Sequence, residues 1–263
     1  MALTRRQRQR WGKALAVVIP VGLVALVAIS ADWGRLGHAF FQPSIAADQF
    51  PKVITVAAKN TIEITALAFL GGLLLGLVAA ILRLSPIRPY RWIGTVYVEF
   101  FRGIPALITL LWIGFALPIA MGVRVPGGDL GPKAFALAIV AGAYIAEVIR
   151  AGIQAVPKGQ TEAARSLGMS PARTTVSIVL PQAFRIVIPP LTNELVLLVK
   201  DSSLVYVLGT TAAGVELTKY ARDASLHHFN GTPITVAAAM YLAISLPLTR
   251  VSAMLERRGG RSR

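Results

Sequence analysis

Residues 64–82 read ITALAFLGGLLLGLVAAIL, nineteen residues in succession without a charge. A helix of this length spans the ~30 Å hydrocarbon core of a bilayer, since the rise is ~1.5 Å per residue. Three more uncharged runs, of 18 to 21 residues, lie at 14–31, 103–123 and 229–249. The chain therefore reads as an all-α polytopic membrane protein.

Two further apolar segments carry charges inside them and complete a set of six expected spans. Glu147 and Arg150 interrupt residues 134–156, while Glu194, Lys200 and Asp201 interrupt residues 186–208. Composition agrees, because 55% of residues are hydrophobic, the mean hydropathy is +0.63 and only 15% are charged. Soluble domains carry roughly 25% charged residues.

The distribution of cations predicts the orientation. Of the 27 Lys and Arg residues, 19 fall in the loops and tails of one side and 7 in the loops of the other. Positive charge accumulates on the cytoplasmic side, so both termini are expected in the cytoplasm. The net charge of +15 is thus explained without a nucleic-acid partner. The chain has no Cys, which excludes disulfides and thiolate metal sites.

The first apolar run has two interpretations, a signal peptide or a retained span. Its 18 residues exceed the usual ~7–15 apolar residues of a signal peptide, and Ile29-Ser30-Ala31 is a poor cleavage site. A retained span is therefore favoured. On the second run, Gly72 and Gly76 form a G-x-x-x-G pattern that permits close helix contact.

The residue types in the loop at 157–181 indicate where its helices begin and end. Pro157 suits the start of a helix, and Gly168 suits its end. Ser170 is a candidate N-cap with Pro171 in the first turn, and Pro181 is expected to end or kink the second helix. The pattern predicts two short helices joined by a glycine corner. Either they dock on another protein or they pack on their own bundle.

This loop resembles the E-A-A-x-x-x-G-x(9)-I-x-L-P signature of permeases in ABC-type importers. The matching residues are Glu162, Ala163, Ala164 and Gly168, then Ile178, Leu180 and Pro181. Segments 99–105 (EFFRGIP) and 142–147 (GAYIAE) resemble the polar amino-acid branch of that family (His, Gln, Glu or Arg carriers). The resemblance covers about residues 53–256.

The resemblance implies an architecture and a set of partners. Residues 53–256 would form a five-helix importer core with coupling helices at about 157–181. Residues 1–52 would add a basic tail, an extra span and an outer loop, and residues 257–263 a basic cytoplasmic tail. The partners would be a dimer of a cytoplasmic ATP-binding subunit, a second permease (identical or related), an external solute-binding protein and a polar amino acid. The location would be the bacterial inner membrane.

The resemblance also assigns roles to residues. The helix that docks on the ATPase subunit would include Gly159, Gln160, Glu162, Ala163, Ala164, Leu167 and Gly168. Where most relatives have Thr, Ser202 stands here and keeps the hydroxyl. The chain has no G-x-x-x-x-G-K-[ST] motif, so ATP and Mg are expected on the partner and not on this chain.

Charges inside spans need a partner or a cavity, because each costs ~2.5–3.5 kcal/mol at the bilayer centre. Glu99 with Arg102, and Glu147 with Arg150, are three residues apart and are expected to pair within their helices near the cytoplasmic ends. Structural pairing is favoured, and the alternative is a cytoplasmic gate or a contact beneath the ATPase.

Glu194 lies about eight residues into the fifth span and has no cation three or four residues away. It must find a partner on another helix, face a cavity or bind a charged solute. The candidate substrate path consists of Asn193, Glu194, Lys200 and Ser202. His227 and His228 lack a third ligand at suitable spacing, so no metal site is expected.

Two other classes of protein fit the sequence less well. An ion-coupled secondary transporter would be expected to show inverted repeats, and none is visible. A membrane enzyme would need a catalytic motif such as G-x-S-x-G or H-E-x-x-H, and neither is present. The sequence leaves open which amino acid is carried and whether the two permeases are identical.

Overall fold

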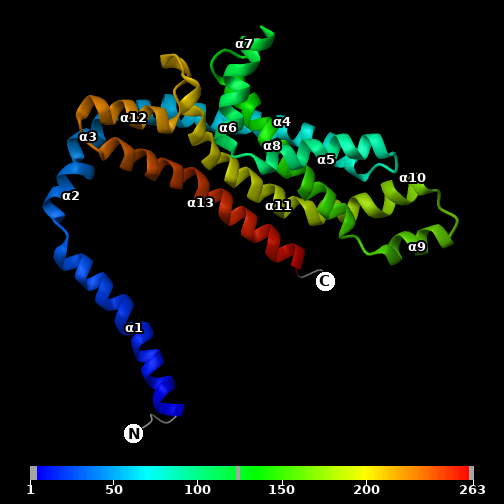
Figure 1. Cartoon of the computed structure of the whole chain (residues 1–263), viewed down its shortest axis with the longest axis horizontal. Coiled ribbons are helices and arrows are strands. Elements are labelled where there is room, and N and C mark those ends of the chain that lie inside the picture. The colour runs from blue at the N-terminus through cyan, green and yellow to red at the C-terminus, as the bar shows by residue number, and fades with distance from the viewer. Residues whose placement is uncertain (1–4, 123–124, 261–263) are drawn as a thin grey trace.

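The computed structural model describes residues 5–122 and 125–260, and within these ranges the protein is helical without strands (Figure 1). The elements in order are α1 (Arg5–Ser30), α2 (Trp33–Phe40), α3 (Pro43–Asp48), the π-helix η1 (Val53–Ala58), α4 (Lys59–Leu84), α5 (Arg88–Gly103), α6 (Ala106–Leu111), the π-helix η2 (Trp112–Ala116), α7 (Leu117–Met121), α8 (Leu130–Gln154), α9 (Lys158–Ser166), α10 (Pro171–Thr174), the π-helix η3 (Thr175–Val179), α11 (Leu180–Asp201), the 3-10 helices η4 (Ser202–Leu208) and η5 (Ala212–Gly214), α12 (Leu217–His228) and α13 (Thr232–Gly260).

Four continuous helical stretches are long and apolar enough to cross a membrane, at Val53–Leu84, Leu130–Gln154, Pro171–Leu208 and Thr232–Arg257. Two bent pairs, Leu15–Ser30 with Trp33–Asp48 and Arg88–Gly103 with Ala106–Ala120, raise the number to six if each pair is one span. The all-α polytopic fold is confirmed, and six is the upper count for the described residues.

The centre of the bundle is the contact between α4 and α8, the most extensive in the molecule. Small residues permit it: a Cβ on Gly72 would lie 3.0 Å from the Cβ of Ala141, and one on Gly76 would lie 2.7 Å from Cγ2 of Ile145. The close contact predicted from the G-x-x-x-G pattern is therefore present. Packing at this distance compensates for the absence of a hydrophobic driving force between helices in lipid.

The uncharged run at 103–123 is not the straight span that its composition predicts. The helix is interrupted at Ile104 and Pro105. The helical axis bends there by 110° between α5 and the segment that begins with α6. Proline has no amide donor, so the break at Pro105 interrupts the backbone ladder. α5, which precedes the run, is the segment that lies beside α4 and α8. Tyr97 fixes it there by donating a hydrogen bond of 2.7 Å to the carbonyl of Ile139.

Pro181 does not end the helix before it, so the first of the two outcomes expected from the sequence, an end or a kink, is not observed. α10, η3 and α11 form one continuous helical stretch that continues into η4, from Pro171 to Leu208. The wider π-turn of η3 immediately precedes Pro181, which stands in the first turn of α11. A π-bulge offers room for a residue without an amide donor, so the helix persists.

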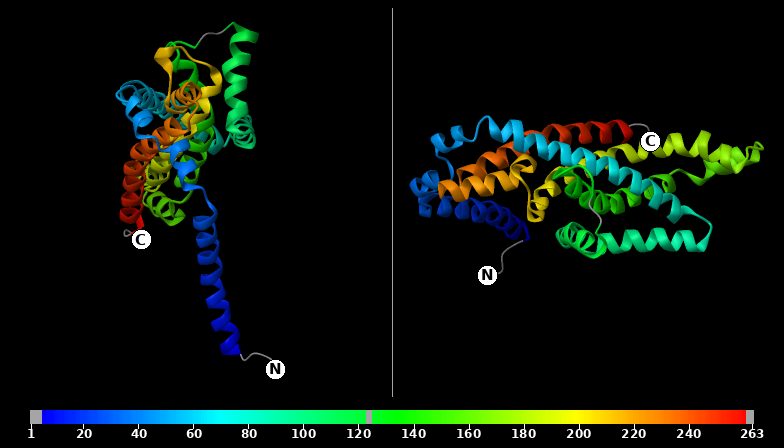
Figure 2. Two further views of the ribbon diagram at one scale, coloured as in Figure 1. Left: turned by 90° about the vertical axis from the view of Figure 1, so that its left-hand side faces the viewer. Right: turned by 90° about the horizontal axis from the view of Figure 1, so that it is seen from above.

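The N-terminal helix stands apart from the bundle, whereas the segment after it is anchored (Figures 1 and 2). Every side chain from residue 15 to 30 is exposed. By contrast, the amide of Gly231 donates to the carbonyl of Ala39 at 2.7 Å, and Asn230 donates to the carbonyl of His38 at 2.7 Å. Residues 33–48 are thus held on the turn between α12 and α13, and α1 has only lipid or another protein to cover it.

Candidate functional site

The hairpin of α9 and α10 projects from one end of the molecule, beyond the ends of α8 and α11 (Figure 1). Gly168 forms the corner with φ +80°, a conformation that favours glycine. The amide of Met169 donates to the carbonyl of Ala164 at 3.2 Å, which closes α9. Ser170 then caps α10 by accepting from the amide of Arg173 at 3.3 Å. The predicted glycine corner and N-cap are both confirmed.

The predicted coupling residues of α9 are presented to the outside of the molecule. Gly159, Gln160, Glu162, Ala163, Leu167 and Gly168 are all exposed, whereas Ala164 is 6% exposed. Leu167, at the tip of the hairpin, is 83% exposed. The small side chain of Ala164 is therefore the part of α9 that packs against its own protein. The exposed surface of α9 is available to a partner.

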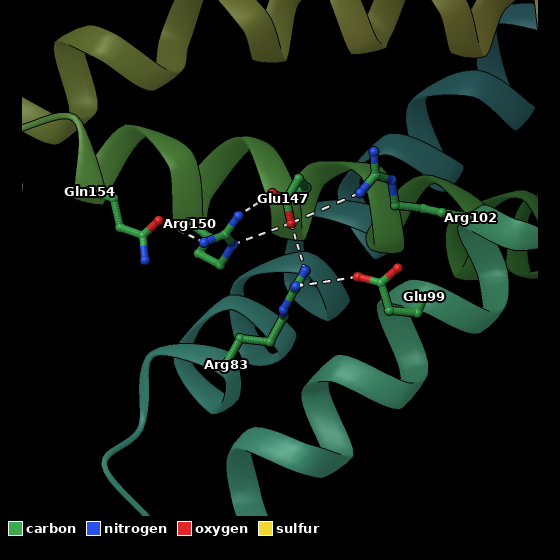
Figure 3. A network of polar contacts seen from close by, with 6 residues as sticks. All are labelled: Arg83, Glu99, Arg102, Glu147, Arg150 and Gln154. Carbon is green, nitrogen blue, oxygen red and sulfur yellow. Dashed lines mark hydrogen bonds and ion pairs between the residues drawn. The ribbon is translucent and has the colours of Figure 1, made fainter.

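Glu147 of α8 is the centre of a polar cluster that joins α4, α5 and α8 (Figure 3). Arg83 Nη1 donates to its carboxylate at 2.5 Å, and Arg150 donates to both of its oxygens, with Nε at 3.2 Å. Arg102 Nη1 is 4.0 Å away. We call the set Arg83, Glu99, Arg102, Glu147, Arg150 and Gln154 the Glu147 cluster.

The cluster confirms one predicted ion pair and corrects the other. Glu147 and Arg150 pair within α8, as their spacing predicts. Glu99 instead meets Arg83 of α4 at 3.4 Å, and Arg102 faces Glu147. The prediction of a Glu99–Arg102 pair was wrong because α4 supplies a cation between α5 and α8, which sequence spacing within α5 does not reveal.

The cluster extends along about two turns of α8, from Glu147 to Gln154, the last residue of that helix. Gly94 of α5 packs against Ala79 and Leu82, near the end of α4. Arg102 is eight residues further along α5, or about 12 Å by helical rise. Glu147 is seven residues before the end of α8, about 10 Å. Arg83 stands in the last turn of α4, so the cluster begins at the end of the bundle that carries α9 and extends inward along α5 and α8.

The predicted substrate-path residues share α11 and its extension but differ in environment. Asn193 and Lys200 are exposed, and Glu194 is half-buried. Ser202 is fully buried and donates to the carbonyl of Val199 at 2.6 Å, so its hydroxyl serves the helix end. Glu194 has neither a hydrogen bond nor an ion pair with any residue of the described chain, so of the three alternatives left open by the sequence, a partner on another helix of this chain is not seen.

A second polar cluster, which the sequence did not indicate, holds the chain at the end of the bundle opposite α9. Asn60 of α4 is buried and donates to the carbonyls of Ala213 and Val215 at 2.7 and 2.9 Å. Lys133 of α8 is 2% exposed and donates to the carbonyl of Gly214 at 2.8 Å. We call Asn60, Asp129 and Lys133, with residues 210–217, the loop clasp.

Two carboxylates complete the loop clasp. Asp129 accepts from the hydroxyl and the amide of Thr211, the amide at 2.6 Å, and these hydrogen bonds lower the pKa of Asp129. Glu216 caps α12 and accepts from Tyr241 of α13 at 3.1 Å, while burial raises its pKa. Lys133 is one of the seven Lys and Arg residues that the sequence places in the loops of the second side, and only the fold shows that its side chain is buried and hydrogen-bonded.

Lys133→Met tests the clasp because methionine keeps the apolar stem and removes the donor. The Gly214 carbonyl would then be buried without its partner, and we expect the free energy of unfolding to fall by about 1–3 kcal/mol. Lys59→Met is the matched control, since Lys59 is 65% exposed and meets Glu63 only at 3.6 Å. Its expected loss is below ~1 kcal/mol. Equal losses in thermal unfolding would contradict the clasp.

Comparison with known proteins identifies the family. The family of the binding-protein-dependent transport system inner membrane component matches residues 72–260. The chain is 40% identical to a probable glutamine ABC transporter permease of Bacillus subtilis (strain 168) over 76% of this chain and 89% of the relative. It is 38% identical to the L-cystine transport system permease of the same organism, over 81% and 89%.

Solved structures agree with this match. The crystal structure of an amino acid ABC transporter with histidines superposes with a TM-score of 0.72 at 35% identity, covering 81% of this chain and 96% of that one. A methionine ABC transporter at 20% identity and a TM-score of 0.63 shares the fold. The chain belongs to the family of inner membrane components of binding-protein-dependent transport systems. It is a transport subunit, and in this family the ATPase is a separate chain.

Proposed function

We propose that this chain is the membrane-spanning permease of an ATP-driven importer of a polar amino acid. The relatives named above are permeases for glutamine and L-cystine, and another, 36% identical, is a glutamate/aspartate import permease of Escherichia coli O6:H1. The substrates named for these three permeases all carry an α-carboxylate and an α-ammonium. The comparisons offer no support for the ion-coupled transporter weighed above.

The observation that carries the proposal is the projecting α9 hairpin. Its exposed face includes Glu162, Ala163 and Leu167, and the helix is joined at both ends to long helices of the bundle, α8 before it and the α10–α11 stretch after it. A partner that moves α9 therefore moves both helices. We assign the contact with the partner ATPase to the exposed residues of this segment, Gly159, Gln160, Glu162, Ala163, Leu167 and Gly168, and we assign to the buried Ala164 the support of that contact. ATP and Mg would act on the partner.

The remaining partners and the topology follow from the same proposal. A dimer of ATP-binding subunits would receive α9 of this chain and of a second permease, while an external binding protein would deliver the solute on the opposite side. The excess of Lys and Arg on one side supports cytoplasmic termini. We propose residues 53–256 as the importer domain and residues 1–52 and 257–263 as additions, with α2 and α3 docked on α12 and α13.

We place the solute path along α11, beside Glu194. Its half-buried carboxylate has no partner within the described chain, and a charge at this depth needs one. Asn193 and Lys200, which are exposed on the same helix, would face either the path or the second permease. Ser202 would support the path by stabilising the end of α11.

Uptake by the reconstituted complex tests the proposal. Proteoliposomes that contain the permease, its ATPase and its binding protein would be loaded with ATP and offered labelled glutamine, cystine, glutamate, arginine and histidine, with a sugar and an oligopeptide as controls. We expect uptake of at least one polar amino acid and of neither control. Uptake of a control in preference to every amino acid would refute the proposed substrate class.

A further inference from the structure

Helix α2 has an apolar face that the rest of the described chain leaves exposed. Trp33, Leu36 and Phe40 stand three and four residues apart, so they share one side of the helix, and all three are exposed. Arg35 and His38 stand on the other side, since one turn takes about 3.6 residues. No residue of α2 is buried in the structure. The helix is therefore amphipathic, and its apolar side is open to a partner.

The bend before α2 gives this helix its direction. The segment from Leu15 to Ile29 is apolar and exposed all round, as expected of a membrane span. Asp32 then starts α2 by accepting a hydrogen bond of 2.9 Å from the amide of Arg35. Between Leu15–Ser30 and Trp33–Asp48 the helical axis bends by 76°. A span followed by a bend of this size leads into a segment that runs nearly parallel to the membrane surface.

Polar contacts fix the orientation of α2 at the end of the bundle opposite α9 (Figure 1). The indole nitrogen of Trp33 donates to the carbonyl of Ala28 at 2.7 Å, which satisfies a free carbonyl in the last turn of α1. The amide of Gln42, just after the helix, donates to the hydroxyl of Thr232 at 3.0 Å. These bonds add to those already described at the turn between α12 and α13. The apolar face of α2 is thus held in one direction.

The residue types and the position of this face fit lipid. Tryptophan is enriched where the membrane meets water, because one part of its ring system is apolar and the other donates a hydrogen bond. An amphipathic helix with Trp, Phe and Leu on one face and cations on the other lies in that interface. Only Ala31 and Asp32 separate α2 from the apolar surface of α1. A soluble protein on this face would have to displace the lipid around the last turn of α1.

We propose that α2 is an interfacial anchor, which lies in the headgroup region of the membrane with Trp33, Leu36 and Phe40 in lipid and with Arg35 and His38 toward water. With cytoplasmic termini, this interface is the outer one. The inference goes beyond transport and concerns how the chain contacts the lipid surface. Because α2 is hydrogen-bonded to the turn between α12 and α13, the anchor also fixes that turn at the level of the membrane surface.

Spin labelling tests the anchor, because the chain has no Cys and an introduced thiol is unique on it. The full-length permease with Leu36→Cys, Arg35→Cys or Leu23→Cys is labelled, assembled with its ATPase and placed in nanodiscs of phosphatidylethanolamine and phosphatidylglycerol. The readout is the relaxation of the label by oxygen, which concentrates in lipid, relative to relaxation by a water-soluble nickel complex. The ratio of the two gives the depth of the label below the phosphate groups.

We expect the label at Leu36→Cys to lie about 5–10 Å below the phosphate groups. The matched control Arg35→Cys, one residue away on the opposite face, should be reached by the nickel complex. Leu23→Cys, in the middle of α1, should lie deepest, near the centre of the ~30 Å hydrocarbon core. If Leu36→Cys does not assemble, Trp33→Cys carries the same expectation.

Three results would overturn the inference. Equal access of the nickel complex to positions 35 and 36 would mean that the apolar face of α2 lies in water. Exclusion of both reagents from position 36 would mean that a protein covers the face. Access of the nickel complex to position 23 would mean that α1 does not cross the membrane. None of these readings depends on uptake, so the proposed transport function stands or fails separately in the proteoliposome assay.

Discussion

Glu147→Gln is expected to abolish the assembled, active complex. The substitution preserves shape but removes the negative charge that Arg83 and Arg150 share, leaving guanidiniums partly buried among α4, α5 and α8. Arg83 is 13% exposed and Arg150 26%. Removing one partner of a buried pair costs about 3–5 kcal/mol, and partial exposure places this case toward the lower end. Thermal unfolding in detergent and the yield of assembled complex measure the loss.

Glu99→Gln is the matched control for this prediction. Glu99 belongs to the same cluster and meets the same arginine, but its contact is 3.4 Å and its side chain is 63% exposed. An exposed pair of this kind contributes about 0–1 kcal/mol. If the two variants lose equal stability, Glu147 is not the centre of the cluster.

Gly168→Val is expected to leave the protein inserted and to uncouple it from its ATPase. Gly168 has φ +80°, and a left-handed backbone costs a residue with a side chain about 1–2 kcal/mol, with a β-branched residue at the upper end. Relieving this strain would reposition α9 relative to α10. A shift of ~1.4 kcal/mol changes a population tenfold, so we expect uptake per assembled complex to fall by about tenfold.

Open space surrounds Gly168, since a Cβ there would meet no atom within 4 Å. The expected effect therefore comes from the backbone and not from a clash. Gly168→Asn is the control, because asparagine tolerates the left-handed region better than other residues with a side chain. It should retain most of the uptake. Equal impairment by Val and Asn would argue against the corner geometry as the cause.

Local features were predictable where a few neighbouring residues determine them. The corner at Gly168, the cap at Ser170 and the close packing at Gly72 and Gly76 all follow from backbone freedom, hydrogen bonding or side-chain size. Spacing also predicted that Glu194 has no ion pair along its own helix, whereas the absence of a partner on the other described helices was not predictable from it.

Features that depend on how helices lie beside one another were not predictable. Arg83 reaches Glu99 and Glu147 only because α5 runs back along α4. Lys133 is hidden because residues 210–217 return across the start of α8. The sequence analysis assigned a span to the apolar run at 103–123 and none to α5, because α5 has mixed polarity and only one of its faces packs on the bundle. The π-turn before Pro181 has no clear sequence signal.

The energy source for uptake tests the central claim most directly. Proteoliposomes containing the permease, its ATPase and its binding protein would be assayed for amino-acid uptake with ATP inside and with ionophores collapsing every ion gradient, and then with gradients imposed but no ATP. The account predicts uptake in the first condition, lowered about tenfold by Gly168→Val, and none in the second. Uptake driven by a gradient without ATP would contradict it.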